Sequence, residues 1–165
     1  MRRLQPGFVL DLGCGIGRNL SHLYGLGVGV DHNADCVATC RAAGLMAFEP
    51  AAFAESEFAV VDRFDTMLLA HVLEHMTEAE ADDLVTEYLP FIRPEGRVIL
   101  ITPQERGQAS DATHVRFVDE DAVRQMAQRL HLQVVSIRSF PFPRSVGRVF
   151  TYNETVSILS ARQEG

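Results

Sequence analysis

The chain has 165 residues, 47% of them hydrophobic and 22% charged, with a formal net charge of −7 from 15 basic and 22 acidic residues. This composition is typical of one folded, water-soluble domain, which we expect to span residues 1–165. The acidic balance and scattered arginines argue against a nucleic-acid partner, because phosphate contacts need clustered Lys and Arg. No apolar run approaches the roughly 20 residues that cross a bilayer, and the start of the chain lacks a signal-peptide core. We therefore expect a cytoplasmic protein without a membrane span.

The predicted strands and helices alternate along the chain, which is typical of a mainly parallel sheet covered by helices. The predicted strands are Phe8–Leu12, Val28–Asp31, Leu45–Phe48, Thr66–Ala70, Arg97–Thr102, Gln133–Phe140 and residues 149–161. The predicted helices are Ile16–Tyr24, the segment from the Asn33 cap to Ala43, a weak turn opened by Pro50, Thr77–Leu89 and Asp119–Leu130. We expect "RPEG" to form a turn and residues 103–117 a polar loop. No helix separates the last two strands, so they should run antiparallel.

The three cysteines, Cys14, Cys36 and Cys40, are an odd number, and no second pair completes a zinc set. We expect reduced thiols and predict no metal site.

The glycine-rich stretch "VLDLGCGIGRN" follows the first strand and predicts a nucleotide-binding turn. A dinucleotide fingerprint wants a third glycine where this chain has Arg18. Asp11 at the end of the strand would also repel a pyrophosphate. It would instead attract the ammonium group of S-adenosylmethionine, whose carboxylate could meet the N–H groups of the turn. Asp31, 18 residues beyond Gly13, stands where an acid accepts ribose hydroxyls in either cofactor.

Four segments in register, "VLDLGCGIGRN", "GVGVDHN", "FDTMLLAHVLEHM" and "LPFIRPEGRVILITPQ", resemble class I S-adenosylmethionine-dependent methyltransferases. The segments "VLEHM" and "THVRF" resemble the small-molecule group that includes ubiquinone-biosynthesis enzymes. The resemblance implies a Rossmann-like α/β fold with helices on both faces of a seven-stranded sheet. The implied strand order is 3-2-1-4-5-7-6, with strand seven antiparallel. Family members usually carry helices before strand one, where this chain has only "MRRLQPG".

The resemblance also implies which residues contact S-adenosylmethionine and its product S-adenosylhomocysteine. The backbone of Ala70 and His71 would pass beneath the methionine part, Glu49 would meet the adenine amino group, and His32 would pack on the adenine ring. The expected cofactor-binding residues are Asp11, Gly13, Cys14, Gly15, Asp31, His32, Glu49, Ala70 and His71.

Three histidines follow strands four and five, at the edge where ligands bind in open α/β sheets. His71, His75 and His114 are the candidate catalytic residues, because histidine titrates near neutral pH. Alternatively, His75 and Glu74 only orient the loop. Methyl transfer itself is an in-line displacement that needs mainly proximity and orientation.

Two further segments, residues 110–117 and 141–152, predict the walls of a small-molecule acceptor pocket. They mix the rings of Phe117, Phe142 and Tyr152 with the polar groups of His114, Arg116 and Arg144. The arginines would suit a carboxylate or phosphate on the acceptor, unless they are simply solvated and the rings belong to the core.

The function predicted from the sequence is methyl transfer from S-adenosylmethionine to a small-molecule acceptor. The alternatives are a non-catalytic S-adenosylmethionine-binding module that needs a partner, and a nicotinamide oxidoreductase, which Asp11 and Arg18 disfavour. The short segment before strand one predicts exposed apolar surface beside that strand, covered by a second copy or by another protein.

Overall fold

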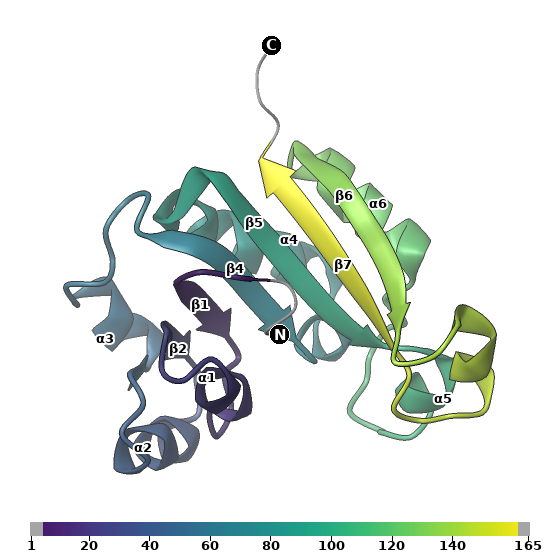
Figure 1. The fold of residues 1–165 in the computed structure, drawn as a ribbon, viewed down its shortest axis with the longest axis horizontal. Coiled ribbons are helices and arrows are strands. Elements are labelled where there is room, and N and C mark those ends of the chain that lie inside the picture. The colour runs from purple at the N-terminus through teal and green to yellow at the C-terminus, as the bar shows by residue number, and fades with distance from the viewer. Residues whose placement is uncertain (1–4, 162–165) are drawn as a thin grey trace.

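The computed structural model describes residues 5–161, which form one seven-stranded sheet flanked by helices (Figure 1). The strands are β1 (Val9–Leu12), β2 (Gly27–Val30), β3 (Ala47–Phe48), β4 (Phe64–Ala70), β5 (Ile92–Pro103), β6 (Leu132–Phe140) and β7 (Glu154–Ala161). The helices are α1 (Arg18–His22), α2 (Ala34–Ala42), α3 (Pro50–Ala54), α4 (Glu78–Tyr88), α5 (Glu105–Gln108) and α6 (Glu120–Arg129). Short 3-10 turns are η2 (Leu73–His75), η3 (Leu89–Phe91) and η4 (Arg144–Arg148).

The strand order is β3-β2-β1-β4-β5-β7-β6, as predicted. Strands β1 to β5 pair in parallel, and β7 runs antiparallel to both β5 and β6. The antiparallel strand follows from the short connection between β6 and β7, which leaves no room for a crossover helix.

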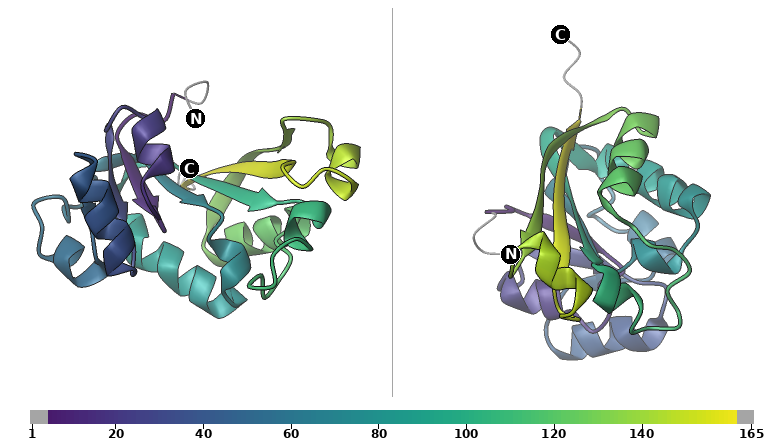
Figure 2. Two further views of the ribbon diagram at one scale, coloured as in Figure 1. Left: turned by 90° about the horizontal axis from the view of Figure 1, so that it is seen from below. Right: turned by 90° about the vertical axis from the view of Figure 1, so that its right-hand side faces the viewer.

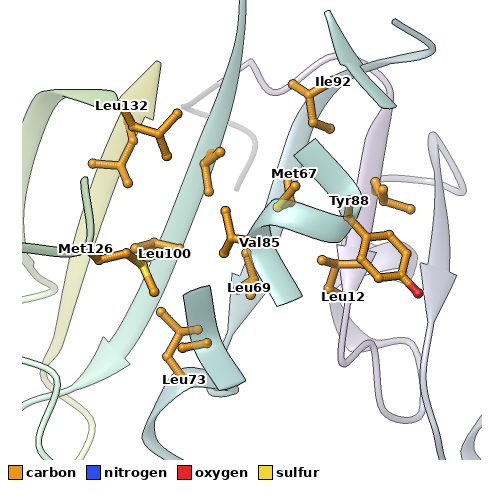
Figure 3. Close-up of a cluster of buried hydrophobic side chains, with 14 of the residues drawn as sticks. Leu12, Met67, Leu69, Leu73, Val85, Tyr88, Ile92, Leu100, Met126 and Leu132 are labelled. Atoms are coloured by element: carbon orange, nitrogen blue, oxygen red, sulfur yellow. The ribbon is translucent and has the colours of Figure 1, made fainter. Parts of the chain in front are cut away.

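The helices lie on both faces of the sheet (Figure 2): α1 lies over β1 and β2 on one face, and α4 and α6 lie on the other. The main core fills the space between the sheet and α4 and α6 (Figure 3). Leu69, Leu100 and Val85 meet there, each with no exposed surface. A sheet buried in this way presents nearly continuous apolar strands, as β4 does.

Helix ends match the capping residues of the sequence. The Asn33 side chain accepts hydrogen bonds from the N–H groups of Asp35 and Cys36, and Asp119 accepts one from Ala122. Thr77 and Glu80 form the predicted reciprocal capping box. These contacts fix where α2, α4 and α6 begin.

The boundaries of several predicted elements were wrong. Strand β3 begins at Ala47 and not at Leu45, and β4 begins at Phe64 and not at Thr66. Helix α1 is shorter than Ile16–Tyr24, because Gly17 precedes it with a left-handed φ of 81°. Strand β5 begins at Ile92, since "RPEG" continues the strand past an irregularity in its pairing with β4. Residues 105–108 form α5 inside the predicted loop. Strand β7 begins at Glu154, because residues 144–148 wind into η4 first.

The predicted apolar surface beside β1 lies further along the sheet. Val9 of β1 is buried, whereas Ile101, Val156 and Ile158 are only half-buried on a face of β5 and β7 that no helix of residues 5–161 covers (Figure 1). No described helix is long and apolar enough to cross a membrane.

Candidate active site

The carboxyl ends of four parallel strands lie side by side at one edge of the sheet, because β3, β2, β1 and β4 are successive neighbours. Open α/β sheets bind ligands at this edge. The structure brings to it all the predicted cofactor residues: Asp11, Gly13, Cys14, Gly15, Asp31, His32, Glu49, Ala70 and His71.

The glycine turn after β1 needs backbone angles that side chains disfavour. Gly13 and Gly15 have φ values of 68° and 53°. A Cβ at Gly13 would come within 2.5 Å of a Val72 methyl group, whereas a Cβ at Gly15 would meet nothing within 4 Å. The turn is therefore packed against the chain at Gly13 and open at Gly15, where a ligand can approach the backbone.

The carboxyl group of Asp11 is fully buried, and neither oxygen has a hydrogen-bond partner. Desolvation raises its pKa from 3.8 to about 7, opposed by nearby Asn19 and reinforced by the charge of Asp31. A buried, unpaired carboxylate is costly. The ammonium group of S-adenosylmethionine would supply the missing partner, so these residues fit that cofactor.

Asp31 joins the glycine turn to the end of β2. Its Oδ2 accepts a hydrogen bond from the Gly15 N–H at 2.7 Å, and its Oδ1 accepts one from the Asn33 N–H at 2.9 Å. A carboxylate has about four acceptor positions, so Asp31 can also accept ribose hydroxyls. The Gly15 N–H, expected to be free for a ligand carboxylate, is engaged by Asp31.

His32 and Glu49 flank this edge with exposed side chains. His32 is 94% exposed, with its Nδ1 3.8 Å from Asp31 Oδ1, and Glu49 precedes α3 without capping it. Their contacts with adenine stay predictions. Cys14 is a buried free thiol whose pKa is raised well above its ordinary value by burial, so it has no thiolate to act as a nucleophile.

His71, directly after β4, lies between two carboxylates and has a left-handed φ of 58°. Its Nε2 is 2.8 Å from Glu154 Oε1, and its Nδ1 is 3.1 Å from Glu74 Oε1. The hydrogen bonds to Glu154 and then Glu74 raise the pKa of His71 to about 9. At neutral pH the ring is therefore an imidazolium with no free lone pair, and it cannot accept a proton.

His75 and His114 lie close together beside the same buried Glu74. Their rings meet edge to face with centroids 4.8 Å apart, and His114 Nε2 is 4.0 Å from Glu74 Oε1. The backbone carbonyl of Glu74 also accepts a hydrogen bond from the Val115 N–H. The structure thus gathers the three candidate histidines around one carboxylate that joins η2 to the loop after α5.

The family model described as a methyltransferase domain matches residues 2–137, most of the chain. The chain belongs to the methyltransferase domain family. No curated protein sequence matched it significantly.

Solved structures with the same fold are also methyltransferases. A S-adenosylmethionine-dependent methyltransferase from Archaeoglobus fulgidus matches with a TM-score of 0.75 and 19% identity over 96% of this chain and 90% of that one. A chain from the complex of the Haloferax volcanii Trm112 methyltransferase activator with a putative methyltransferase matches with a TM-score of 0.73 and 19% identity, over 97% and 84% of the chains. The Burkholderia thailandensis 1,6-didemethyltoxoflavin-N1-methyltransferase, with 1,6-didemethyltoxoflavin and S-adenosylhomocysteine bound, matches with a TM-score of 0.69 and 18% identity, over 98% and 74%.

The family model confirms the predicted methyltransferase, and the strand order confirms the fold expected from the resemblance to class I S-adenosylmethionine-dependent methyltransferases. The comparisons do not single out the ubiquinone-biosynthesis group, and they give no support to a non-catalytic binding module.

The methyltransferase has three further polar residues at this edge that the sequence did not indicate. Glu154 contacts His71, and buried Gln104 donates from Nε2 to the Glu154 carbonyl at 3.0 Å. Buried Asn153 donates from Nδ2 to Gln104 Oε1 at 2.9 Å. The only signal was the polar pair "NE" before an apolar final strand.

The predicted arginines of the acceptor pocket are used within the methyltransferase itself. Arg144 forms a two-pronged ion pair with Glu105, and Arg116 Nε donates to the carbonyls of Leu73 and Met76. Arg116 Nη2 is buried without a hydrogen-bond partner, so only part of this guanidinium is used by the backbone. Two surface hollows, which share Arg93 and Gly96 in their walls, lie at the opposite edge of the sheet, by the strand starts.

Proposed function

We propose that this methyltransferase methylates a small-molecule acceptor, with Asp11, Asp31 and the glycine turn binding S-adenosylmethionine. The observation that carries the proposal is the buried Asp11 carboxylate without a partner, next to a turn that is open at Gly15. When bound, the cofactor supplies a methyl group activated by a sulfonium. The chain then contributes binding and orientation, with Asp11 holding the ammonium and Asp31 the ribose.

The acceptor would contact a group of exposed aromatic rings between β6 and β7. Phe142, Phe150 and Tyr152 are 48%, 36% and 75% exposed, and their rings meet edge to face in series, with centroids 5.5 and 5.7 Å apart. Asn153 anchors the segment by accepting a hydrogen bond from the Phe142 N–H. The adjoining Glu154 contacts His71 directly after β4, which connects this segment to the candidate site. Exposed rings beside a few polar groups suit an apolar or planar acceptor, and one structural neighbour does hold a toxoflavin precursor.

Calorimetry with S-adenosylhomocysteine and with NAD tests the cofactor site. A turnover assay tests the acceptor class: it offers a library of small molecules and measures the S-adenosylhomocysteine that is formed. We expect binding of S-adenosylhomocysteine, no binding of NAD, and turnover of at least one small molecule. Methylation of a protein or nucleic acid instead would refute the proposed acceptor.

Replacing Asp31 should weaken cofactor binding. We expect Asp31→Ala to reduce the affinity for S-adenosylhomocysteine by about 1–3 kcal/mol, the scale for hydrogen bonds to a charged group. Calorimetry measures the affinity, and thermal unfolding shows whether the variant is folded. Unchanged affinity in a folded variant would remove Asp31 from the site.

Replacing an exposed ring should affect the acceptor alone. We expect Tyr152→Ala and Phe142→Ala to raise the acceptor KM about tenfold or more, since an aromatic contact and its buried area contribute over 1 kcal/mol, while the affinity for S-adenosylhomocysteine is unchanged. Tyr24→Ala, which removes a 72% exposed ring from the turn after α1, is the matched control. If all three variants behave alike, the rings between β6 and β7 do not bind the acceptor.

A further inference from the structure

Glu74, His75 and His114 form a cluster whose chemistry methyl transfer does not require. One potential ligand atom from each residue lies within 4.8 Å of the other two. Glu74 has no exposed surface, and its Oε2 is buried without a hydrogen-bond partner. His114 has only 8% of its side chain exposed, whereas His75 is exposed. A buried carboxylate oxygen without a partner needs a proton donor or a cation.

The hydrogen bonds of the two histidines fix which ring nitrogen is free. His75 Nδ1 lies 3.3 Å from the Thr113 carbonyl and 3.1 Å from Thr113 Oγ1, whose own proton goes to Asp111 Oδ1 at 2.7 Å. Both neighbours of His75 Nδ1 are therefore acceptors, so this nitrogen carries the proton. His114 Nδ1 similarly lies 3.0 Å from the Gln108 carbonyl and donates to it. Nε2 is therefore the nitrogen of each ring that is left to bind a cation.

This arrangement has the features of a metal site with its outer hydrogen bonds already formed. Histidines that bind metals usually donate their second ring N–H to a carbonyl or carboxylate, which orients the ring and fixes the tautomer. Glu74 Oε1 contacts His71 and lies 4.0 Å from His114 Nε2, and Oε2 has no partner, so this carboxylate is the third potential ligand. Two imidazole nitrogens and one carboxylate oxygen are a donor set that zinc accepts, with its fourth position open.

We propose that Glu74, His75 and His114 bind a divalent transition metal ion, zinc by preference, that fastens the loop after α5 to η2. This differs from the absence of a metal site predicted from the sequence. Ligand bonds of about 2.0–2.2 Å in a tetrahedral zinc site place the ligand atoms roughly 3.4 Å apart. The cluster must therefore contract from its present spread of up to 4.8 Å. His75, the exposed member, is the one free to move.

Titration of tag-free, chelator-treated protein with Co²⁺, followed by competition with Zn²⁺, tests the site. We expect one Co²⁺ per chain, a visible spectrum of nitrogen and oxygen ligands, displacement by Zn²⁺, and a higher Tm with metal. His75→Ala and His114→Ala should each lower the metal affinity more than about 100-fold. Thr113→Val, which removes an outer hydrogen bond, should lower it by about 10-fold or more. His22→Ala, an exposed histidine on α1, should leave it unchanged.

A purely hydrogen-bonded role for the cluster gives different results. The proposal is overturned if metal fails to bind at one per chain, or if binding persists in His75→Ala and His114→Ala. It is equally overturned if a thiolate-to-cobalt band assigns the metal to the cysteines. His114→Gln keeps a hydrogen-bond donor for the Gln108 carbonyl but removes the metal ligand. If the metal-free variant has a Tm near that of the wild type and has lost its metal affinity, then His114 is a ligand and is not needed only for folding. These readouts require neither acceptor nor cofactor, so they are independent of the proposed acceptor class.

Discussion

Replacing Asp11 by Asn is expected to make the cofactor-free protein more stable at pH 8 while weakening cofactor binding. The buried Asp11 carboxylate has no partner, and its pKa of about 7, against 3.8 in an unfolded chain, corresponds to about 4 kcal/mol of destabilisation above pH 7. Asn removes the charge but brings an amide that also needs partners, so we expect a net gain of at least about 1 kcal/mol, or about 2–4 °C in Tm. Affinity for S-adenosylhomocysteine should fall by about 10- to 100-fold, because the ammonium loses its counter-charge.

The raised pKa of Asp11 makes the folded protein less stable as the pH increases. Between pH 4 and pH 7 the folded state holds a proton on Asp11 that the unfolded state has released, so the contribution of Asp11 to stability falls as pH rises through this window and is constant above it. Thermal unfolding at pH 5 and pH 8 should show the wild type losing more Tm than Asp11→Asn. Asp83→Asn, an exposed substitution on α4 with the same change of charge, should follow the wild type. Equal pH dependence in wild type and Asp11→Asn would show that Asp11 does not titrate there.

The same carboxylate should couple cofactor binding to pH. Below pH 7 the ammonium must displace a proton from Asp11, so wild-type affinity should decrease as the pH falls from 8 to 6. The affinity of Asp11→Asn should stay flat over that range. Calorimetry at both pH values measures this difference directly.

The sequence predicted the sheet because its signals are local. The glycine turn, the caps Asn33 and Asp119, and the alternation of apolar strands with helices each fix an element from neighbouring residues. The parallel direction of the strands then follows from the crossover helices, and the antiparallel β7 from the missing helix, whereas the strand order came from the family resemblance. The boundary errors fall where local signals compete. The left-handed backbone of Gly17 extends the glycine turn, so α1 begins later than predicted. An irregularity in the pairing of β4 with β5 allows "RPEG" to belong to the strand and not to a turn.

The candidate site was only partly predictable, since half of it depends on contacts distant in sequence. Asp11, Asp31 and the glycines sit in a compact motif, and the sequence indicates them. Glu154 meets His71 across 83 residues, because β7 pairs with β5 in a register that places Glu154 opposite Pro103. No pattern near either residue reveals that register. The pairing changes the role available to His71 from a base to an imidazolium.

Glu154→Gln should lower the pKa of His71 and change how stability depends on pH above neutrality. The folded-state pKa of His71, about 9, lies above its unfolded value of 6.5. The stability from this ion pair is therefore fully present below pH 6.5 and lost as pH rises through 9. Because the His71 side chain is 46% exposed, solvent screening reduces the effect to about 1 kcal/mol, or about 2–4 °C in Tm. The wild type should lose this stability between pH 7 and pH 9.5, and Glu154→Gln should lose less.

Activity over the same pH range distinguishes two roles for His71. In the first role, the His71 imidazolium positions the end of β4 through its contacts with Glu74 and Glu154. The rate of methyl transfer should then be constant from pH 7 to pH 8.5 and decline above pH 9, as the ring loses its proton. If His71 were the general base, the rate would instead rise toward pH 9. Glu154→Gln would then move that rise to lower pH, because His71 would deprotonate earlier. Asp11 loses its proton as the pH rises through about 7, whereas His71 loses its proton near pH 9, so profiles at acid and alkaline pH separate the cofactor side of the site from the acceptor side.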